Sequence, residues 1–199
     1  MGKDEILDFV RVMKAKDHVI MFYTDRKDKR LILFTYLKAG LDSGEAAIYV
    51  AGDESPNQIK KAMEEFGLNV KQYEKTYALN VMDYRDWYMT KGKFDIGNTI
   101  SLWKKSFGQA MARGFKGLRV AGEMGFFFTH GMINELVVYE RSLHRELETP
   151  LEAICAYDDT LVVKGAEEQH YLRLYLDLIV AHKITLFIGP EEAGVIRTT

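Results

Sequence analysis

Short apolar runs alternate with longer amphipathic segments along most of this 199-residue chain, and no other feature constrains its fold as strongly. A short apolar run bounded by turn residues is typical of a buried strand, whereas apolar residues at helical spacing indicate a helix that packs on a sheet. Strands and helices that alternate in this way predict a mainly parallel sheet covered by helices on both faces. We therefore expect an α/β protein with three layers, α/β/α.

The strand signals are compact and apolar. The first, at 18–23, reads His-Val-Ile-Met-Phe-Tyr, and the second, at 46–51, is equally apolar. Further strands are expected over 77–82, within 118–128, over 151–157 and over 185–188. The aromatic stretch 83–97 is predicted to be a loop with a helical turn, and the polar tail from Pro190 to be loose.

The helix signals lie between the strands. Asp4 can cap the first helix, and Ser55 followed by Pro56 is a typical start for a helix that stops at Gly67. Predicted helices cover 4–15, a segment from the charged stretch 25–30 to about Leu41, 55–66, 98–113, 131–147 and 167–182. The chain contains no internal repeat, low-complexity segment or linker, so we expect a single domain over 1–199.

Charge and cysteine content narrow the class of protein. The net charge is −2 and basic residues are interleaved with acidic ones, so we do not expect direct binding to nucleic acid. The one cysteine, Cys155, excludes an internal disulfide and a metal site built from several cysteines. No run of about 18 apolar residues suits a membrane helix, and the N-terminus lacks the apolar core of a secretory signal. A cytoplasmic protein with no membrane partner is the expectation.

The turn after the first predicted strand lacks the features of a phosphate-binding loop. Such a loop needs several glycines, whose backbone N–H groups approach the anion, and then Lys-Ser or Lys-Thr. Here the segment 24–30 reads Thr-Asp-Arg-Lys-Asp-Lys-Arg, no glycine lies between Gly2 and Gly40, and no Gly-x-Gly-x-x-Gly pattern occurs. We therefore predict a binding protein rather than an enzyme, with no catalytic residues, no metal and no cofactor.

Ligands of open α/β sheets bind beyond the carboxyl ends of the strands. The residues at these ends mix aromatic side chains with carboxylates, which favours a small, apolar organic ligand over a phosphate-rich one. The predicted pocket is lined by Tyr23, Tyr84, Trp87, Met124, Phe126 and Tyr157, with Arg119, Glu123 and Asp158 as orienting polar contacts. A second interpretation of the aromatic residues between Tyr84 and Trp103 is core beneath a long connection.

Arg119 and Glu123 fall on the same face of their predicted strand, but an extended chain places them about 13 Å apart, too far to pair. Each needs another partner, such as Glu140 for Arg119, or a ligand. Structural ion pairs between helix and sheet are one interpretation, and ligand contacts are the other. Glu123 also stands where an ATPase places a catalytic acid, which the missing phosphate loop disfavours.

The histidines and the cysteine show no spacing typical of a metal site or a catalytic triad. The histidines are His18, His130, His144, His170 and His182, and neither His-x-x-x-His nor His-Glu-x-x-His occurs. We expect capping or core positions for them. Cys155 lies in an apolar strand, where a thiol is usually an inert core residue.

Six segments occur in an order that resembles the MEDS domain, the methanogen/methylotroph sensory domain. They are 18–23, 44–50, 116–124 with Leu-Arg-Val-Ala-Gly-Glu, Tyr139-Glu140, 154–158 with Cys-Ala-Tyr-Asp, and Ala181-His182. The ordered series, from about 6 to 189, carries the resemblance. Its motif positions correspond here to His18, Tyr139, Glu140, Cys155 and His182, beside Tyr23, Arg119, Glu123, Tyr157 and Asp158 of the predicted pocket.

The resemblance implies a RecA-like or KaiC-like fold that lacks the ATPase motifs, in agreement with the missing glycine loop. It also implies a sensory role with a small, hydrocarbon-derived ligand. Domains that resemble this one are often fused to histidine kinases or DNA-binding modules; no such module is attached here, so we expect signal transduction through a separate protein partner. A homo-oligomer is expected by analogy with RecA-like domains alone.

Three hypotheses about function remain open. The first is a sensory domain that binds a small molecule and thereby shifts the population of segment 83–97. The second is a degenerate RecA-like ATPase homologue that acts as an assembly or regulatory partner, which a large apolar surface patch would favour. The third is an enzyme that uses Glu123 or Asp158 as acid or base, with a nucleotide held in an unfamiliar way.

Overall fold

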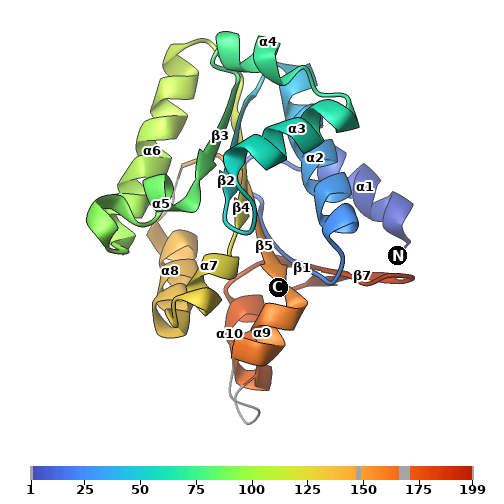
Figure 1. Ribbon diagram of the computed structural model, residues 1–199, viewed down its shortest axis with the longest axis vertical. Coiled ribbons are helices and arrows are strands. Elements are labelled where there is room, and N and C mark those ends of the chain that lie inside the picture. The colour runs from blue at the N-terminus through green and yellow to red at the C-terminus, as the bar shows by residue number, and fades with distance from the viewer. Residues whose placement is uncertain (1, 147–148, 166–170, 199) are drawn as a thin grey trace.

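A seven-stranded sheet runs through the middle of the molecule in the computed structural model, which describes residues 2–146, 149–165 and 171–198 (Figure 1). The strands are β1 (His18–Tyr23), β2 (Ala46–Ala51), β3 (Leu79–Asp83), β4 (Leu118–Glu123), β5 (Glu152–Asp158), β6 (Ile184–Ile188) and β7 (Ala193–Arg197). The helices are α1 (Lys3–Arg11), α2 (Arg26–Ser43), α3 (Pro56–Phe66), α4 (Val70–Lys75), α5 (Tyr84–Trp87), the 3₁₀ turn η1 (Thr90–Gly92), α6 (Ile96–Ala112), α7 (Gly125–Thr129), α8 (Ile133–Glu146), α9 (Asp159–Gly165) and α10 (Tyr171–Val180).

The strands lie in the order β3-β2-β4-β5-β1-β6-β7. All neighbours are parallel except β6 and β7, and β1 lies between β5 and β6 with Tyr23 opposite both Asp158 and Ile188. The prediction of a loose tail was wrong, because residues 193–197 form the antiparallel edge strand β7. Ala193 and Val195 pack on the core there and β7 pairs with the backbone of β6.

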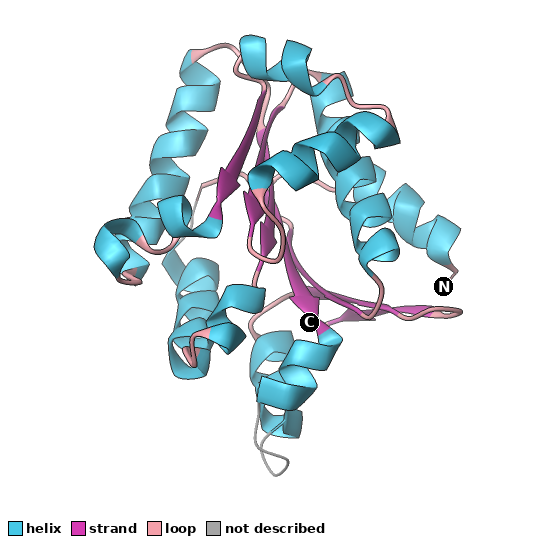
Figure 2. Cartoon of the chain, viewed as in Figure 1, coloured by secondary structure: helices cyan, strands magenta, loops and turns pink. Residues whose placement is uncertain are grey.

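Helices cover both faces of the sheet, which confirms the predicted three-layer α/β class (Figure 2). One face packs against α1, α2 and α3, and β1 contributes Val19 and Met21 to it. The opposite face packs against α6, α8 and α10, and β1 contributes Ile20 and Phe22. Because both faces of β1 are buried, its sequence is a continuous apolar run rather than an alternating one.

Local signals fix the ends of the two long helices beside β2. The Asp25 carboxylate caps α2 by accepting the N–H groups of Lys27 and Asp28, and the Ser55 hydroxyl accepts the N–H of Gln58 at the start of α3. Helix α2 continues past Gly40, where a side chain would meet Arg119 Cδ at 2.4 Å, and ends at Gly44 with φ +87°. Left-handed backbone of this kind favours glycine.

Several short helices were not predicted, because a helix of four to seven residues does not show a full amphipathic period. They are α4, α7 and α9, of which α7 follows β4 and begins inside the segment 118–128, within which the sequence predicts a strand. The predicted helices over 131–147 and 167–182 include residues that the structure does not describe. Within the described residues, the first corresponds to α8 and the second to α10. The side chain of His144 and the whole of His170 also lie outside it. None of the described helices combines the length and apolarity needed to cross a bilayer.

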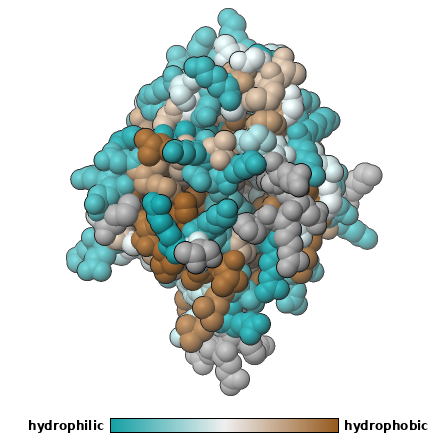
Figure 3. Space-filling model, turned by 180° about the vertical axis from the view of Figure 1, so that it is seen from behind, coloured by the Kyte–Doolittle hydropathy of each residue, from teal (hydrophilic) through white to brown (hydrophobic). Residues whose placement is uncertain are grey.

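Helix α10 carries an exposed apolar stripe. Leu172, Leu176 and Val180 follow each other at four-residue spacing, and 63%, 58% and 66% of their surfaces are exposed. Figure 3 shows hydrophobic side chains gathered toward the lower end of the rear face, the end at which α9 and α10 lie in Figure 1. Exposed apolar groups arranged in this way are typical of surfaces that contact another protein.

Candidate functional site

A buried cluster of charged groups lies at the carboxyl ends of the strands, on the face covered by α2. Lys29, in α2, has no exposed surface, and its Nζ lies 2.6 Å from Glu123 Oε1 and 3.1 Å from Asp53 Oδ2. Burial alone would lower the pKa of Lys29, but Glu123 and Asp53 together raise it above its ordinary value. Lys29 is therefore a buried cation held between two carboxylates.

The Glu123 carboxylate is the point on which four donors of this cluster converge. Besides Lys29, it accepts the Tyr49 hydroxyl at 2.5 Å and the backbone N–H groups of Gly52 and Asp53 at 2.8 Å each. Gly52 has to be small, because a Cβ there would lie 2.7 Å from the carbonyl oxygen of Glu123. The Lys29 ammonium and the N–H groups of Gly52 and Asp53 thus already bind a carboxylate of the chain, as the N–H groups of Lys27 and Asp28 bind the Asp25 cap.

A wide cavity of about 740 Å³ lies next to this cluster, beyond the strand ends. Three of the predicted pocket residues, Tyr23, Phe126 and Asp158, line it. The charged residues Asp25, Arg26, Lys27, Lys29, Arg30 and Asp53 line it as well. The cavity therefore has a mixed wall with many charged side chains, whereas the sequence predicted a mainly apolar pocket at this edge of the sheet.

The structure brings only part of the predicted pocket together. Tyr84 is half-buried and stacks on Phe126 with ring centroids 4.7 Å apart. Trp87 and Met124 are buried in the core; Trp87 packs edge-on against Trp103, and the Met124 sulfur accepts the Tyr88 hydroxyl. The aromatic residues between Tyr84 and Trp103 thus form mainly core, one of the two interpretations that the sequence left open.

Arg119 lies at the opposite end of β4 from Glu123, on the same face of the sheet. Its Nε donates to Glu45 at 2.6 Å and lies 3.3 Å from Glu152 Oε2. Its Nη1 donates to the carbonyl oxygens of Val10 and Tyr36, which belong to α1 and α2. The suggested pairing with Glu140 was wrong, because Glu140 is on α8, which covers the other face.

A second cluster lies on that other face, and four separate elements contribute to it. His18 begins β1, Glu140 is on α8, Cys155 is in β5, and His182 precedes β6. One ligand atom from each lies within 4.8 Å of the other three. Glu140, Cys155 and His182 are buried and His18 is half-buried. All four are among the motif positions that the resemblance to the MEDS domain singled out.

Neighbouring groups orient the two most deeply buried side chains of this cluster. The Tyr157 hydroxyl donates to Glu140 Oε1, and His182 Nδ1 lies 2.7 Å from the carbonyl oxygen of Leu178, to which it donates. Burial would raise the pKa of Glu140, but His182, His18 and the Tyr157 hydroxyl bring it below its ordinary value. Glu140 is therefore a carboxylate anion without exposed surface, and an anion in that position needs a cation beside it.

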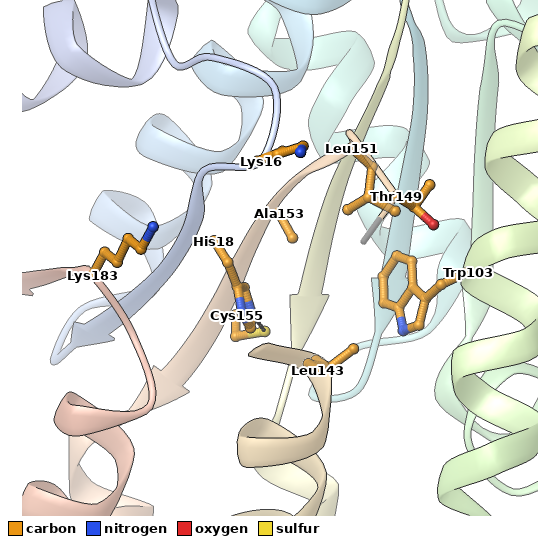
Figure 4. Close-up of a pocket in the computed structure, with 9 residues that line it drawn as sticks. All are labelled: Lys16, His18, Trp103, Leu143, Thr149, Leu151, Ala153, Cys155 and Lys183. Atoms are coloured by element: carbon orange, nitrogen blue, oxygen red, sulfur yellow. Dashed lines mark hydrogen bonds between the residues drawn. The ribbon is translucent and has the colours of Figure 1, made fainter. Parts of the chain in front are cut away.

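A pocket of about 180 Å³ reaches His18 and Cys155 at the amino ends of β1 and β5 (Figure 4). Trp103, Leu143, Leu151 and Ala153 give it an apolar wall, and Lys16, Thr149 and Lys183 complete the lining. The Trp103 indole is fixed by a hydrogen bond of 2.9 Å to the hydroxyl of Tyr139, another motif residue. Lys16 holds a φ of +76°, which residues other than glycine rarely adopt and which often marks functional sites.

The pocket and its cluster could not be found from residue spacing. Metal and catalytic sites with a local signature place several groups on one helix turn or loop. Here the four residues are far apart in sequence, and the position of β1 between β5 and β6 brings His18, Cys155 and His182 together. The signal that did select these residues was the resemblance to a family.

Solved structures share the architecture. A KaiC-like protein from the archaeon Pyrococcus horikoshii matches 93% of this chain and 79% of its own chain, with a TM-score of 0.62 and 14% sequence identity. An uncharacterised protein from the same organism, solved in complex with an unknown peptide, matches 94% of this chain and 84% of its own, with a TM-score of 0.67 and 11% identity. The chain therefore has the expected RecA/KaiC-like α/β fold.

The family pattern described as "MEthanogen/methylotroph, DcmR Sensory domain", or MEDS, matches residues 17–170. The chain belongs to this family, as its sequence motifs predicted. A UPF0273 protein from Thermotoga maritima is 50% identical over 82 residues, which are 41% of this chain and 33% of that protein. A second, from Methanopyrus kandleri, is 30% identical over 82 residues, 41% of this chain and 32% of its own length. The chain thus matches about a third of the length of these relatives.

Proposed function

We propose that this chain is a sensory domain that binds a small, mainly apolar organic molecule in the pocket above His18 and Cys155. The composition of the pocket supports this proposal most strongly, since an apolar wall with a few convergent polar groups is typical of small-molecule sites. The volume of about 180 Å³ is smaller than that of a site for drug-sized ligands, so a molecule of few non-hydrogen atoms fits. Membership in a family of sensory domains agrees with it.

This pocket differs from the one that the sequence favoured, at the carboxyl ends of the strands. The cavity there has charged walls, and its buried anions are already matched by Lys29 and backbone donors. It therefore suits an apolar ligand less well. Tyr157 connects the predicted residues to the proposed pocket, because its hydroxyl binds Glu140 in the cluster that His18 and Cys155 belong to.

A thermal-shift screen with small neutral organic molecules tests the proposal, beginning with any compound that native mass spectrometry finds bound to freshly purified protein. A ligand at a hundred times its Kd adds about 2.7 kcal/mol to the stability of the folded chain. For a domain of this size we expect a rise in Tm of about 5–10 °C. Ala153→Leu, which fills part of the pocket, should abolish the rise.

Asp158→Asn provides the matched control, because Asp158 lines the cavity at the strand ends and not the proposed pocket. The rise in Tm should persist in this variant. If Asp158→Asn abolished the rise and Ala153→Leu did not, the ligand would bind at the strand ends. If no compound co-purified and none in the panel raised the Tm of the wild-type chain, the sensory proposal would fail.

The exposed stripe on α10 supports a second candidate function, that of an assembly or regulatory partner. In the sensory proposal, the same surface could pass the signal to a separate protein. The simplest occupant to test is a second copy of the chain, and light scattering behind size-exclusion chromatography measures its presence. We expect the wild-type chain to self-associate at micromolar concentration and the variant Leu172→Glu/Leu176→Glu to be monomeric.

Val12→Glu is the control for this experiment, since Val12 is 68% exposed but belongs to the end of α1. The oligomeric state of this variant, measured in the same way, should equal that of the wild type. Self-association through α10 would be contradicted if the wild-type chain were monomeric at all concentrations. It would also be contradicted if Val12→Glu disrupted the oligomer as much as the α10 variant does.

A further inference from the structure

We infer that His18, Glu140, Cys155 and His182 bind a divalent transition-metal ion, with zinc as the best match. Two imidazoles, a thiolate and a carboxylate are the donor groups that zinc takes in proteins, and magnesium and calcium prefer oxygen ligands alone. The site adjoins the proposed ligand pocket, but the inference does not depend on what that pocket binds.

The separations between the donor atoms fit one central ion. Metal–nitrogen and metal–oxygen bonds of about 2.0–2.1 Å, with a metal–sulfur bond of about 2.3 Å, place the ligand atoms of a tetrahedral site roughly 3.3–3.6 Å apart. His18 Nε2 lies 3.2 Å from Cys155 Sγ and 3.7 Å from Glu140 Oε2. His182 Nε2 lies 3.3 Å from the same Glu140 oxygen. These three separations are close to that range, and all four ligand atoms lie within 4.8 Å of one another.

Two buried atoms that lack a hydrogen-bond partner also favour a bound metal ion. Glu140 Oε2 and His182 Nε2 have no hydrogen-bond partner among the described residues, although they lie close together. Because His182 donates from Nδ1 to Leu178, a neutral ring turns the lone pair of Nε2 into the cluster. An ion bound to both atoms would give each of them the partner that it lacks.

The charges of the four residues match a divalent ion. Glu140 and the Cys155 thiolate supply two negative charges, and two neutral histidines supply none, so the loaded site is neutral, as burial favours. The thiol proton passes to solvent when the sulfur–metal bond forms. The hydrogen bonds from Tyr157 to Glu140 and from His182 to Leu178 are the kind of outer contacts that fix metal ligands.

Cobalt spectroscopy gives a sharp test, because Cys155 is the only cysteine of the chain. A thiolate-to-cobalt charge-transfer band can therefore come from no other residue. The full chain is stripped with a chelator and titrated with Co²⁺, and then with Zn²⁺ in competition with a fluorescent chelator. We expect one ion per chain, the thiolate band, the intense visible bands of a tetrahedral site, and a zinc Kd on the order of 0.1 μM or tighter.

Three variants separate ligands from neighbours, and circular dichroism establishes that each is folded. Cys155→Ala should remove the thiolate band and weaken zinc binding by more than about 100-fold, a larger loss than an outer contact causes. Tyr157→Phe should keep the band and weaken binding by about 10–100-fold, because only an outer hydrogen bond is lost. His130→Ala removes an exposed histidine outside the cluster and should change neither.

Two results would overturn the inference. One is a zinc Kd weaker than about 0.1 mM for the folded wild-type chain, which would mean that Glu140 is compensated without a metal ion. The other is an affinity that Cys155→Ala leaves unchanged. Neither result affects the thermal-shift test of the ligand pocket, which uses Ala153→Leu and can be carried out on the metal-stripped chain.

Discussion

Replacing Lys29 with methionine is expected to lower the free energy of unfolding by about 3–5 kcal/mol, the usual cost of removing one partner of a buried ion pair. Methionine keeps a similar length and an unbranched chain but removes the ammonium group. Glu123 and Asp53 would then share a buried site without the cation that now lies 2.6 Å and 3.1 Å from them. Urea unfolding near pH 7, followed by circular dichroism, measures the change.

Lys27→Met is the matched control, because Lys27 is on the same helix but exposed. Its effect should stay within about 0.5 kcal/mol. The double variant Lys29→Met/Glu123→Gln should recover part of the loss, since the amide oxygen still accepts the N–H groups of Gly52 and Asp53 without a buried charge. A loss of less than about 1 kcal/mol for Lys29→Met would contradict a structural role for this lysine.

Arg119→Met is expected to cost a similar amount, about 3–5 kcal/mol, at the other end of β4. The guanidinium joins Glu45 and Glu152 to the carbonyl oxygens of Val10 and Tyr36, so one side chain connects the sheet to α1 and α2. Its removal leaves two carboxylates and two carbonyl groups without their donor. Arg113→Met, at an exposed arginine, should change stability by no more than about 0.5 kcal/mol in the same urea titration.

The cost of Arg119→Met should also depend on pH. Burial raises the pKa of Glu152 to about 7, although Arg119 pulls it down. A carboxyl group whose pKa is higher in the folded state contributes stability that is complete below its unfolded pKa and is lost as pH rises through the folded pKa. Because the loss of Arg119 raises this pKa further, the two folded forms differ in the protonation of Glu152 only near and above the wild-type pKa, so the penalty should grow as pH rises from about 6 to about 9. A penalty that shrinks over this range would contradict the assigned contact.

The strands were the most predictable part of the fold. The structure places β1 and β2 at the predicted residues 18–23 and 46–51, because both faces of these strands are buried and the whole run must be apolar. The edge strand β7 was not predicted, since only Ala193 and Val195 pack on the core and Ile196 and Arg197 are exposed, so the segment has no continuous apolar run. Short helices such as α7 were not predicted either, because their limits depend on the packing around them.

The candidate sites were also predicted only in part from the sequence. Local pattern identified the missing phosphate loop and placed Tyr23, Phe126 and Asp158 at a strand-end cavity. It did not reveal that Lys29 neutralises the carboxylates there, because burial of a lysine within a charged segment has no sequence signature. Trp87 and Met124 were assigned to a pocket wall and lie in the core, since position beyond a strand does not fix the direction of a side chain.

The amino-acid sequence by itself determined the layered α/β architecture and the family, because periodicity and ordered motifs are properties of the chain alone. Only the tertiary structure decided which distant residues meet. Strand order places His18, Cys155 and His182 on one face beside Glu140, and Lys29 on the other face beside Glu123. Such contacts depend on the order of the strands in the sheet and on which polar groups are buried in the same place. Neither can be inferred from the spacing of residues along the chain.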